Sequence, residues 1–540
     1  MRLKIIAFSI VLFFSIQNAS AITKYYFYVQ FANKNNTSFS LSTPSDYLSA
    51  RAIARRAAFN IPIDSTDLPV NQTYINQISN LGHKVICRSK WMNGITVLIT
   101  DSSLMNQVRN LSFVRWAKYT GKVEVAQTAP RRVKQEPQIL NYGTSANQLN
   151  QINASYLHNL GYTGKNIHVA VLDAGFSNVN TNQGFDSLRL QGRLLGTKDF
   201  TELTPNIYGS DAHGSNVLSI MAGNLPNQYL GAAPHASYWL IRTEYAPSEY
   251  VSETDFWVSG IEFADSVGVD VANSSLGYTT FDDPVLNYTY ANMNGTFSRA
   301  SRAATMAVKK GILVCNSAGN DGNKTWHYIG VPADATDIVT VGAAELSGIP
   351  STFTSYGPTS DNRQKPDISA MGTATAYINT SGGLSSGNGT SYSTPVMAGM
   401  FACFLQYAKA NFNSFSIQTL IQSAKKSANL YTNPTYRLGH GIPNFQTACA
   451  YLPAMIDVLK QTDNDIRVFQ NNASNLLIIN TQYTGNLSAT LYSISGLICY
   501  KGTLSNKQSS ISTAGFASGI YILKVSGNGT TKTQKIVIGK

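Results

Sequence analysis

The stretch from Gly389 to Gly399 constrains the fold of this 540-residue chain more than any other. Its glycine start permits a tight turn, and the apolar run that follows is hydrophobic on nearly every face, which is typical of a buried helix. Pro395 is tolerated only near a helix start, because backbone N–H groups there lack intrahelical partners. Ser391 is therefore predicted at the N-terminus of a central helix, where free N–H groups favour a developing negative charge. Taken alone, Ser391 is equally well explained as a helix N-cap.

The composition is that of an exported protein with a sizeable core. Hydrophobic residues make up 43% of the chain and charged residues only 13%, against a usual ~25%. The formal net charge is +12, from 41 lysines and arginines against 29 acidic residues. Because the sequence has no arginine-rich helix and no basic cluster interleaved with aromatic residues, we expect no nucleic-acid partner.

Residues 1–21 have the pattern of a secretory signal peptide. Arg2 and Lys4 precede an apolar run over 5–16, and Ala19-Ser20-Ala21 is a small-x-small cleavage site. No later stretch is apolar for the ~18 residues that a membrane span requires. The cysteines show neither CxxC nor zinc spacing, so we expect buried thiols, and a disulfide stays an open alternative.

Residues 22–125 predict a small α+β domain. Its elements follow the order β-α-β-β-α-β, which is the ferredoxin-like pattern. The expected strands are 24–31, 84–91, 94–100 and 113–119, and the expected helices 74–81 and 103–111. An additional helix with a basic face is expected over 47–59. Residues 126–145 are predicted to form a linker, in which Arg131-Arg132 is a plausible processing site.

Residues 146–452 alternate between apolar strands and helices, which predicts an α/β fold with a mostly parallel sheet covered by helices on both faces. The expected strands are 166–172, 237–242, 270–273, 311–316 and 337–342, and the expected helices 214–222, 255–267, 299–310 and 395–410. Residues 463–540 instead hold short strands between Asn, Gly and Ser turns, which predicts a C-terminal all-β sandwich.

Three polar signals follow apolar strands or open a helix within 146–452. Asp173 ends a strand, where ligands of parallel sheets bind. His213, followed by glycine, opens a helix, and Asn320 lies in a glycine-rich turn after a strand. Each has an ordinary structural alternative: a loop cap, a surface histidine and a plain turn.

Together with Ser391, these residues fit acyl transfer. A serine hydroxyl is a weak nucleophile unless a base removes its proton, and His213 can do so near neutral pH. Asp173 would hold the imidazole tautomer. The Asn320 side chain and the Ser391 backbone N–H would receive the oxyanion.

The chain resembles the subtilisin-like serine proteases (subtilases). The order Asp173, His213, Ser391 matches, as do the segments 273–277, 352–358 and 365–368. The resemblance implies that the edge segment Ser275-Leu276-Gly277 pairs with the substrate backbone. It also implies that Ser317, Ala318 and Gly319 form the opposite wall of the first specificity pocket.

The sequence departs from the family pattern at three places. Asn216 stands where the family has a second histidine, and Tyr392-Ser393 replaces Met-Ala after the nucleophile. We expect altered packing and no loss of activity. Segment 278–298 is an apparent insertion near the substrate cleft, for which a solvated loop and a weak structural calcium site are the alternatives. No cofactor is expected to be required.

The flanking domains resemble known companions of such proteases. The N-terminal domain resembles subtilase propeptides, which chaperone folding and occlude the cleft. The C-terminal domain resembles the sorting domains that Bacteroidetes use for type IX secretion, on cues such as 515–521 and the lysine-ended last strand. A carbohydrate-binding or structural β-domain is the alternative for this last part.

Two other functions are alternatives to a protease. An α/β-hydrolase esterase is disfavoured, because Ser393 interrupts the G-x-S-x-G motif and the triad order would differ. A catalytically silent protein that binds peptides or glycans is disfavoured because all the candidate catalytic residues are present. The sequence therefore predicts a serine endopeptidase, secreted or at the cell surface and made as a zymogen. We expect a monomer whose partners are protein or peptide substrates, its own propeptide and the secretion machinery.

Overall fold

The structure is a computed structural model of the chain. It describes residues 23–123, 141–201, 206–464, 466–471, 476–481, 487–504, 508–527 and 530–538. The chain divides into two compact units, one formed by residues up to 411 and 428–445, the other by 412–427 and 446–540. The signal peptide and the Arg131-Arg132 site that the sequence predicts lie outside the described residues.

Residues 23–123, the N-terminal layer, form a four-stranded antiparallel sheet in the order β2-β3-β1-β4. Two of its helices, at 72–80 and 105–109, cover one face over a core that includes Val29, Ile78 and Val97. The predicted ferredoxin-like architecture is confirmed. The elements are β1 (Lys24–Phe31), α1 (Ala50–Ala58), α2 (Gln72–Asn80), β2 (Lys84–Ser89), β3 (Gly94–Ile99), α3 (Met105–Arg109) and β4 (Val114–Val123).

A seven-stranded sheet in the order β13-β12-β11-β10-β5-β9-β6 forms the centre of the first unit, and its paired strands are all parallel. The predicted fold class is confirmed. The strands are β5 (His168–Asp173), β6 (Leu194–Asp199), β9 (Ser237–Arg242), β10 (Val271–Ser274), β11 (Leu313–Ser317), β12 (Val339–Ala344) and β13 (Ile368–Met371). The two edge strands, β6 and β13, were not anticipated: β6 is only half buried and β13 has four residues.

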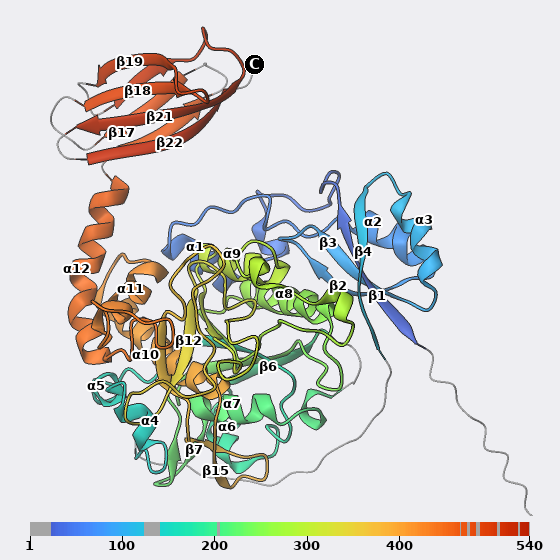
Figure 1. Ribbon diagram of the computed structural model, residues 1–540, viewed down its shortest axis with the longest axis vertical. Coiled ribbons are helices and arrows are strands. Elements are labelled where there is room, and N and C mark those ends of the chain that lie inside the picture. The colour runs from blue at the N-terminus through green and yellow to red at the C-terminus, as the bar shows by residue number, and fades with distance from the viewer. Residues whose placement is uncertain are drawn as a thin grey trace, which may run out of the picture. The chain divides into compact units, whose positions relative to one another are not determined.

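Helices cover both faces of this sheet (Figure 1). Gly260 of α8 lies against the side chain of Leu172, whereas Gly214 of α7 lies against Asp173. Successive side chains of a strand point to opposite faces, so α7 and α8 lie on opposite sides of β5. The long helices are α7 (His213–Ala222), α8 (Val251–Ser266), α9 (Arg299–Lys309) and α10 (Thr390–Asn411).

Shorter elements complete the first unit. They are α4 (Ala146–Asn150), α5 (Ala154–Asn159), α6 (Asp186–Leu190), β7 (Asn224–Leu225), β8 (Tyr229–Leu230), β14 (Thr375–Ile378) and β15 (Leu384–Gly387). All five cysteines of the chain are free thiols, and Cys499 alone among them is not buried. Among the described residues, no helix combines the length and the apolar character needed to span a membrane.

The second unit holds α11 (Ile417–Ser427), most of α12 (Phe445–Asn464) and two antiparallel sheets. The sheets have the orders β16-β17-β20 and β19-β18-β21-β22. Leu477 and Ile511 of the first sheet share one core with Leu491 and Leu523 of the second, as expected for a sandwich. The strands are β16 (Ile466–Asn471), β17 (Leu476–Thr481), β18 (Leu487–Ser493), β19 (Ile498–Leu504), β20 (Gln508–Ser512), β21 (Gly519–Gly527) and β22 (Thr530–Ile538).

Candidate active site

Asp173 and His213 meet where β5 ends and α7 begins. His213 Nδ1 lies 2.8 Å from Asp173 Oδ1, and the Ala174 N–H donates to the same oxygen at 2.8 Å. Asp173 is fully buried, whereas the His213 side chain is 32% exposed. A Cβ at Gly214 would lie 2.9 Å from Asp173 Cβ and 2.3 Å from the Gly175 carbonyl oxygen, so a residue without a side chain is required after His213. This explains the His-Gly pair of the sequence.

The charge on His213 is favoured by its surroundings. Burial opposes the imidazolium, but the carboxylates of Asp173 and Asp211, with the hydrogen bond to Asp173, raise the pKa of His213 above its usual 6.5. The Asp211 side chain also accepts a hydrogen bond from the His213 backbone N–H at 2.6 Å, which fixes the first turn of α7. These contacts fix the position of His213 and favour the protonated form of its imidazole.

Ser391 lies in the first turn of α10. We expected this helix to begin at Pro395; it begins at Thr390, so the proline falls inside it. Proline has no N–H to donate to the Ser391 carbonyl four residues earlier. The Ser275 hydroxyl donates to that carbonyl instead, at 3.0 Å, and the Ser391 hydroxyl donates back to the Ser275 carbonyl at 3.3 Å. In the described structure, no hydrogen bond joins the Ser391 hydroxyl to His213.

The Asn320 side chain is held with its amide N–H₂ toward Ser391. Its carbonyl oxygen accepts hydrogen bonds from the Thr390 backbone N–H at 2.8 Å and from the Thr390 hydroxyl at 3.0 Å. A Cβ placed on Gly389 would lie 3.7 Å from Asn320 Nδ2 and 3.6 Å from the Ser391 nitrogen. Two N–H donors therefore flank one small space beside the Ser391 side chain. This arrangement suits an oxyanion.

A pocket of about 310 Å³ opens beside Ser391. All the residues predicted to bind substrate line it, namely Ser275, Leu276, Gly277, Ser317, Ala318 and Gly319, together with Asn320. The two walls are tied together, because the Leu276 carbonyl accepts from Asn316 Nδ2 at 3.1 Å and from the Ser317 hydroxyl at 3.2 Å. The structure thus brings together residues that are more than 100 positions apart, such as Ser275 and Ser391.

Several pocket residues were missed by sequence reasoning. Glu244 and Glu249 lie between β9 and α8, and Asp321 follows Asn320. A signal did exist for Glu244, because it follows Arg242, which pairs with Asp173 in the sheet. The other pocket residues not anticipated are Thr279, Gly330 and Thr390.

Tyr392, one of the departures from the family pattern, packs beside the candidate site. Its ring stacks on Tyr377 with the ring centres 5.2 Å apart, and its centre is 6.3 Å from that of His213. Burial raises the pKa of Tyr392 to about 12, so its hydroxyl stays neutral at ordinary pH. Tyr392 therefore forms a wall next to the imidazole and is no competing base.

The N-terminal layer is bound to α8 and α9 by buried polar contacts. The basic face of α1 is buried, with the Arg55 guanidinium 2.5 Å from Asp265. The Glu262 carboxylate accepts hydrogen bonds from the Lys90 and Trp91 backbone N–H groups at 2.7 and 3.0 Å, and from the Ser89 hydroxyl. These contacts hold the end of β2 on α8.

The chain is similar to known proteins. The profile of the Subtilase family matches residues 164–441. Subtilisin NAT of Bacillus subtilis subsp. natto is 27% identical over 374 residues, which are 69% of this chain and 84% of that protein. Subtilisin of Bacillus pumilus is 27% identical over 303 residues, 56% of this chain and 97% of that protein. The solved structure of the prenylagaramide maturation protease PagA covers 56% of this chain and 98% of its own, with 23% identity and a TM-score of 0.43.

The parallel α/β fold and the family match together define the class of the protein as a subtilisin-like protease. The chain belongs to the subtilase family, whose profile covers more than half of it. The Bacteroidota propeptide domain of peptidase S8 matches residues 26–137, and the secretion system C-terminal sorting domain matches 467–539. The protein is accordingly a subtilisin-like endopeptidase made as a zymogen with a propeptide, and its sorting domain directs it to the exterior or the cell surface.

Proposed function

We propose that Asp173, His213 and Ser391 are the catalytic triad. The observation that carries this is the 2.8 Å contact between His213 Nδ1 and the buried Asp173 carboxylate, beside the helix terminus that presents Ser391. Asp173 fixes the tautomer with its proton on Nδ1, which leaves Nε2 as the base. The Ser391 hydroxyl turns from the Ser275 carbonyl to His213 when substrate binds, as catalytic hydrogen bonds often tighten only in the complex.

The reaction then follows from these positions. Ser391 Oγ attacks the scissile carbonyl while His213 takes its proton, and the negative oxygen enters the space between Asn320 Nδ2 and the Ser391 N–H. The imidazolium passes that proton to the leaving amine, which departs and leaves an acyl-enzyme. A water molecule, deprotonated by His213, then hydrolyses the ester.

We propose that the edge at Leu276 and Gly277 pairs with the substrate backbone. Gly277 is exposed, and the chain turns back into the protein only at Tyr278, whose N–H donates to the Val331 carbonyl at 2.8 Å. An extended peptide added there places its side chains toward the pocket between the walls at Ser275 and Ser317. Proteins and peptides are the proposed substrates, and the enzyme acts as a monomer.

Residues 22–125 are proposed to inhibit the mature enzyme. The support is the burial of Arg55 and Glu262 in ion pairs and hydrogen bonds between the N-terminal layer and α8. The proposed catalytic steps require no cofactor. A weak structural calcium site in segment 278–298 is proposed from the sequence alone. Residues 1–21 are proposed to form a signal peptide.

The test is Ser391→Ala in the full chain. It should abolish peptide hydrolysis, by on the order of 10⁶ in turnover, and labelling by a fluorophosphonate, while circular dichroism and melting stay unchanged. Ser393→Ala is the matched control, because that hydroxyl only donates back to the Thr390 carbonyl within α10. Labelling that survives in Ser391→Ala rejects the triad. Hydrolysis of a simple ester but not of any peptide favours the esterase alternative.

A further inference from the structure

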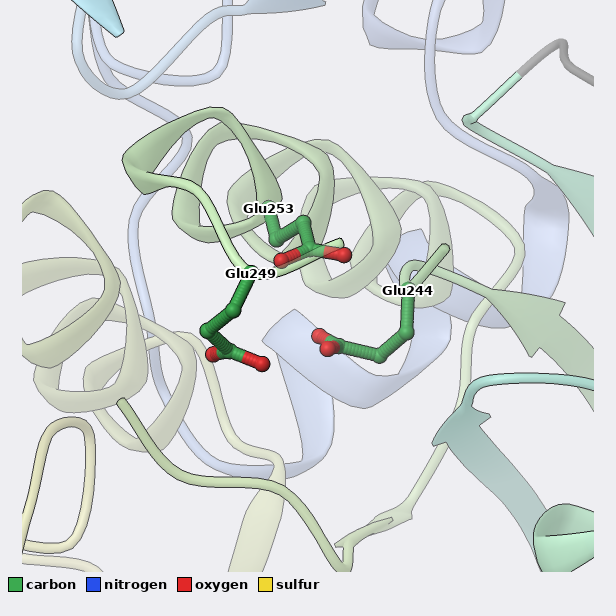
Figure 2. Close-up of side chains that lie close together, drawn as sticks. All are labelled: Glu244, Glu249 and Glu253. Carbon is green, nitrogen blue, oxygen red and sulfur yellow. The ribbon is translucent and has the colours of Figure 1, made fainter. Parts of the chain in front are cut away.

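One side of the active-site pocket is acidic. Glu244 and Glu249 line the same pocket as Ser391, and Glu253 of α8 lies behind them. Carboxylate oxygens of the three residues lie within 4.8 Å of one another. Figure 2 shows the three side chains converging from the loop after β9, the segment before α8 and the first turn of α8. The pocket therefore joins the proposed nucleophile to a cluster of carboxyl groups.

The two pocket-lining carboxylates are incompletely partnered. Glu244 is only 7% exposed, and one of its oxygens accepts a hydrogen bond from the Tyr278 hydroxyl. Among the described residues, its other oxygen and both carboxylate oxygens of Glu249 have no hydrogen-bond partner. Glu253 is different, since both its oxygens accept backbone N–H groups, from Tyr245 at 2.8 Å and Tyr250 at 3.0 Å. Glu253 thus shapes the segment before α8, while the other two face the pocket.

No cation of the described residues forms an ion pair with these glutamates. Burial and the neighbouring Asp282 raise the pKa of Glu249 to about 7, and burial together with the two other glutamates raises the pKa of Glu244 well above its usual range. Asp321, in the same pocket, is in contrast paired with Lys324 at 2.9 Å. Burying a carboxylate without a counter-charge costs free energy, and no described residue supplies that charge to Glu244 or Glu249.

We propose that this pocket binds a lysine or arginine side chain of the substrate, with Glu244 and Glu249 as its specificity-determining residues. The inference rests on the proposed protease function and adds the substrate class. The occupant is part of the peptide because the carboxylates line the same cavity as Ser391 and the peptide-binding edge. A guanidinium or ammonium donates several hydrogen bonds and supplies the missing charge.

The chain's own linker offers a first candidate. β4 leads toward this region, since a Cβ on Gly121 would lie 2.5 Å from Tyr250 Cβ, and Tyr250 adjoins Glu249. Val123 ends β4, and Arg131-Arg132 follows in the sequence after seven residues. The sequence around these arginines is therefore the natural template for a test peptide.

The experiment measures kcat/KM of the mature enzyme on internally quenched peptides with the sequence of residues 126–137. All three sets carry norleucine in place of Lys134, the other basic residue of this segment. The first set keeps Arg131 and Arg132, the second replaces both by norleucine, and the third replaces both by glutamate. We expect the arginine peptide to exceed the norleucine peptide by tenfold or more. Glu244→Gln and Glu249→Gln should each lower the arginine value by about tenfold, as for a lost charge-assisted hydrogen bond, and so reduce the arginine-to-norleucine ratio.

Asp321→Asn is the matched control, because its charge in the same pocket is already balanced by Lys324. It should leave the arginine-to-norleucine ratio unchanged, and Glu249→Arg should improve cleavage of the glutamate peptide. Fluorophosphonate labelling shows for each variant that the nucleophile is intact. Wild-type cleavage without a basic preference, or a ratio that both glutamine variants keep, overturns the inference. If wild-type enzyme cleaves no peptide and takes no label, the proposed function itself has failed instead.

Discussion

Replacing Asp173 by asparagine and by alanine separates the two roles proposed for this carboxylate. In the structure the Ala174 N–H and His213 Nδ1–H donate to the same oxygen, Asp173 Oδ1. An asparagine keeps both bonds only when its carbonyl oxygen takes that position, because its NH₂ group there would face two donors. The tautomer of His213 is then preserved, and only the charge is lost. Alanine removes both the charge and the orienting bond.

The magnitudes follow from this difference. Loss of the charge costs roughly 2–4 kcal/mol of transition-state stabilisation, so Asp173→Asn should lower kcat/KM by about 30- to 1,000-fold. Asp173→Ala should cost about 3 × 10⁴-fold in kcat, the value known for the equivalent aspartate of subtilisin. The acidic limb of the pH–rate profile should also move to lower pH in Asp173→Asn, because the carboxylate raises the pKa of His213.

The assay is kcat/KM on one fluorogenic peptide between pH 5 and 9, with active sites counted by fluorophosphonate titration. Equal activities of the asparagine and alanine variants would refute the argument that the Ala174 N–H orients the asparagine so that its oxygen preserves the His213 tautomer. An acidic limb that stays in place in Asp173→Asn would refute the electrostatic role of Asp173.

Three further predictions concern stability and inhibition. The pKa of Glu249 is raised to about 7 in the folded chain, so the unfolded chain loses this proton first and stability falls as pH rises from about 4.5 to 7. In calorimetry of Ser391→Ala protein, Glu249→Gln should therefore raise the melting temperature at pH 8 and leave it unchanged at pH 4. Ser275→Ala should lower the free energy of unfolding by about 1 kcal/mol in urea titrations, and by less when Pro395→Ala restores the missing N–H donor. Arg55→Leu should weaken inhibition by the propeptide added in trans at least tenfold, because it breaks a buried ion pair with Asp265 and removes the hydrogen bond to the Val269 carbonyl. Unchanged inhibition would show that this ion pair does not contribute to propeptide binding.

Much of the fold was predictable because its signals are local. The strand at 24–31 and the strand at 237–242 have the bounds that the sequence pattern gave, since apolar periodicity decides them. The position of Ser391 followed from an apolar run and a glycine turn. The start of α10 did not, because a helix that contains Pro395 depends on a donor from Ser275, a residue 116 positions away.

The parts that were not predictable depend on distant partners. The sequence indicates that α1 has a basic face but names no partner for it, and Arg55 of that face is buried against Asp265, 210 positions along the chain. Glu244 and Glu249 look like surface residues of a loop, and only the fold turns them into the pocket beside Ser391. Charged residues next to an active site are therefore the class that periodicity misplaces most readily, because their burial is set by tertiary contacts.

In α10, which carries the proposed nucleophile, a missing helical hydrogen bond is replaced by a bond to a distant residue. Pro395 deprives the Ser391 carbonyl of its ordinary partner, and an unpaired carbonyl at a buried site costs about 1–3 kcal/mol. The Ser275 hydroxyl removes that cost, and the Ser391 hydroxyl returns a bond to the Ser275 carbonyl. The nucleophile and the edge that is proposed to bind peptide are thus tied to each other directly. We expect a substrate strand added at that edge to shift Ser275 and, through these two hydrogen bonds, the Ser391 hydroxyl that is proposed to turn toward His213.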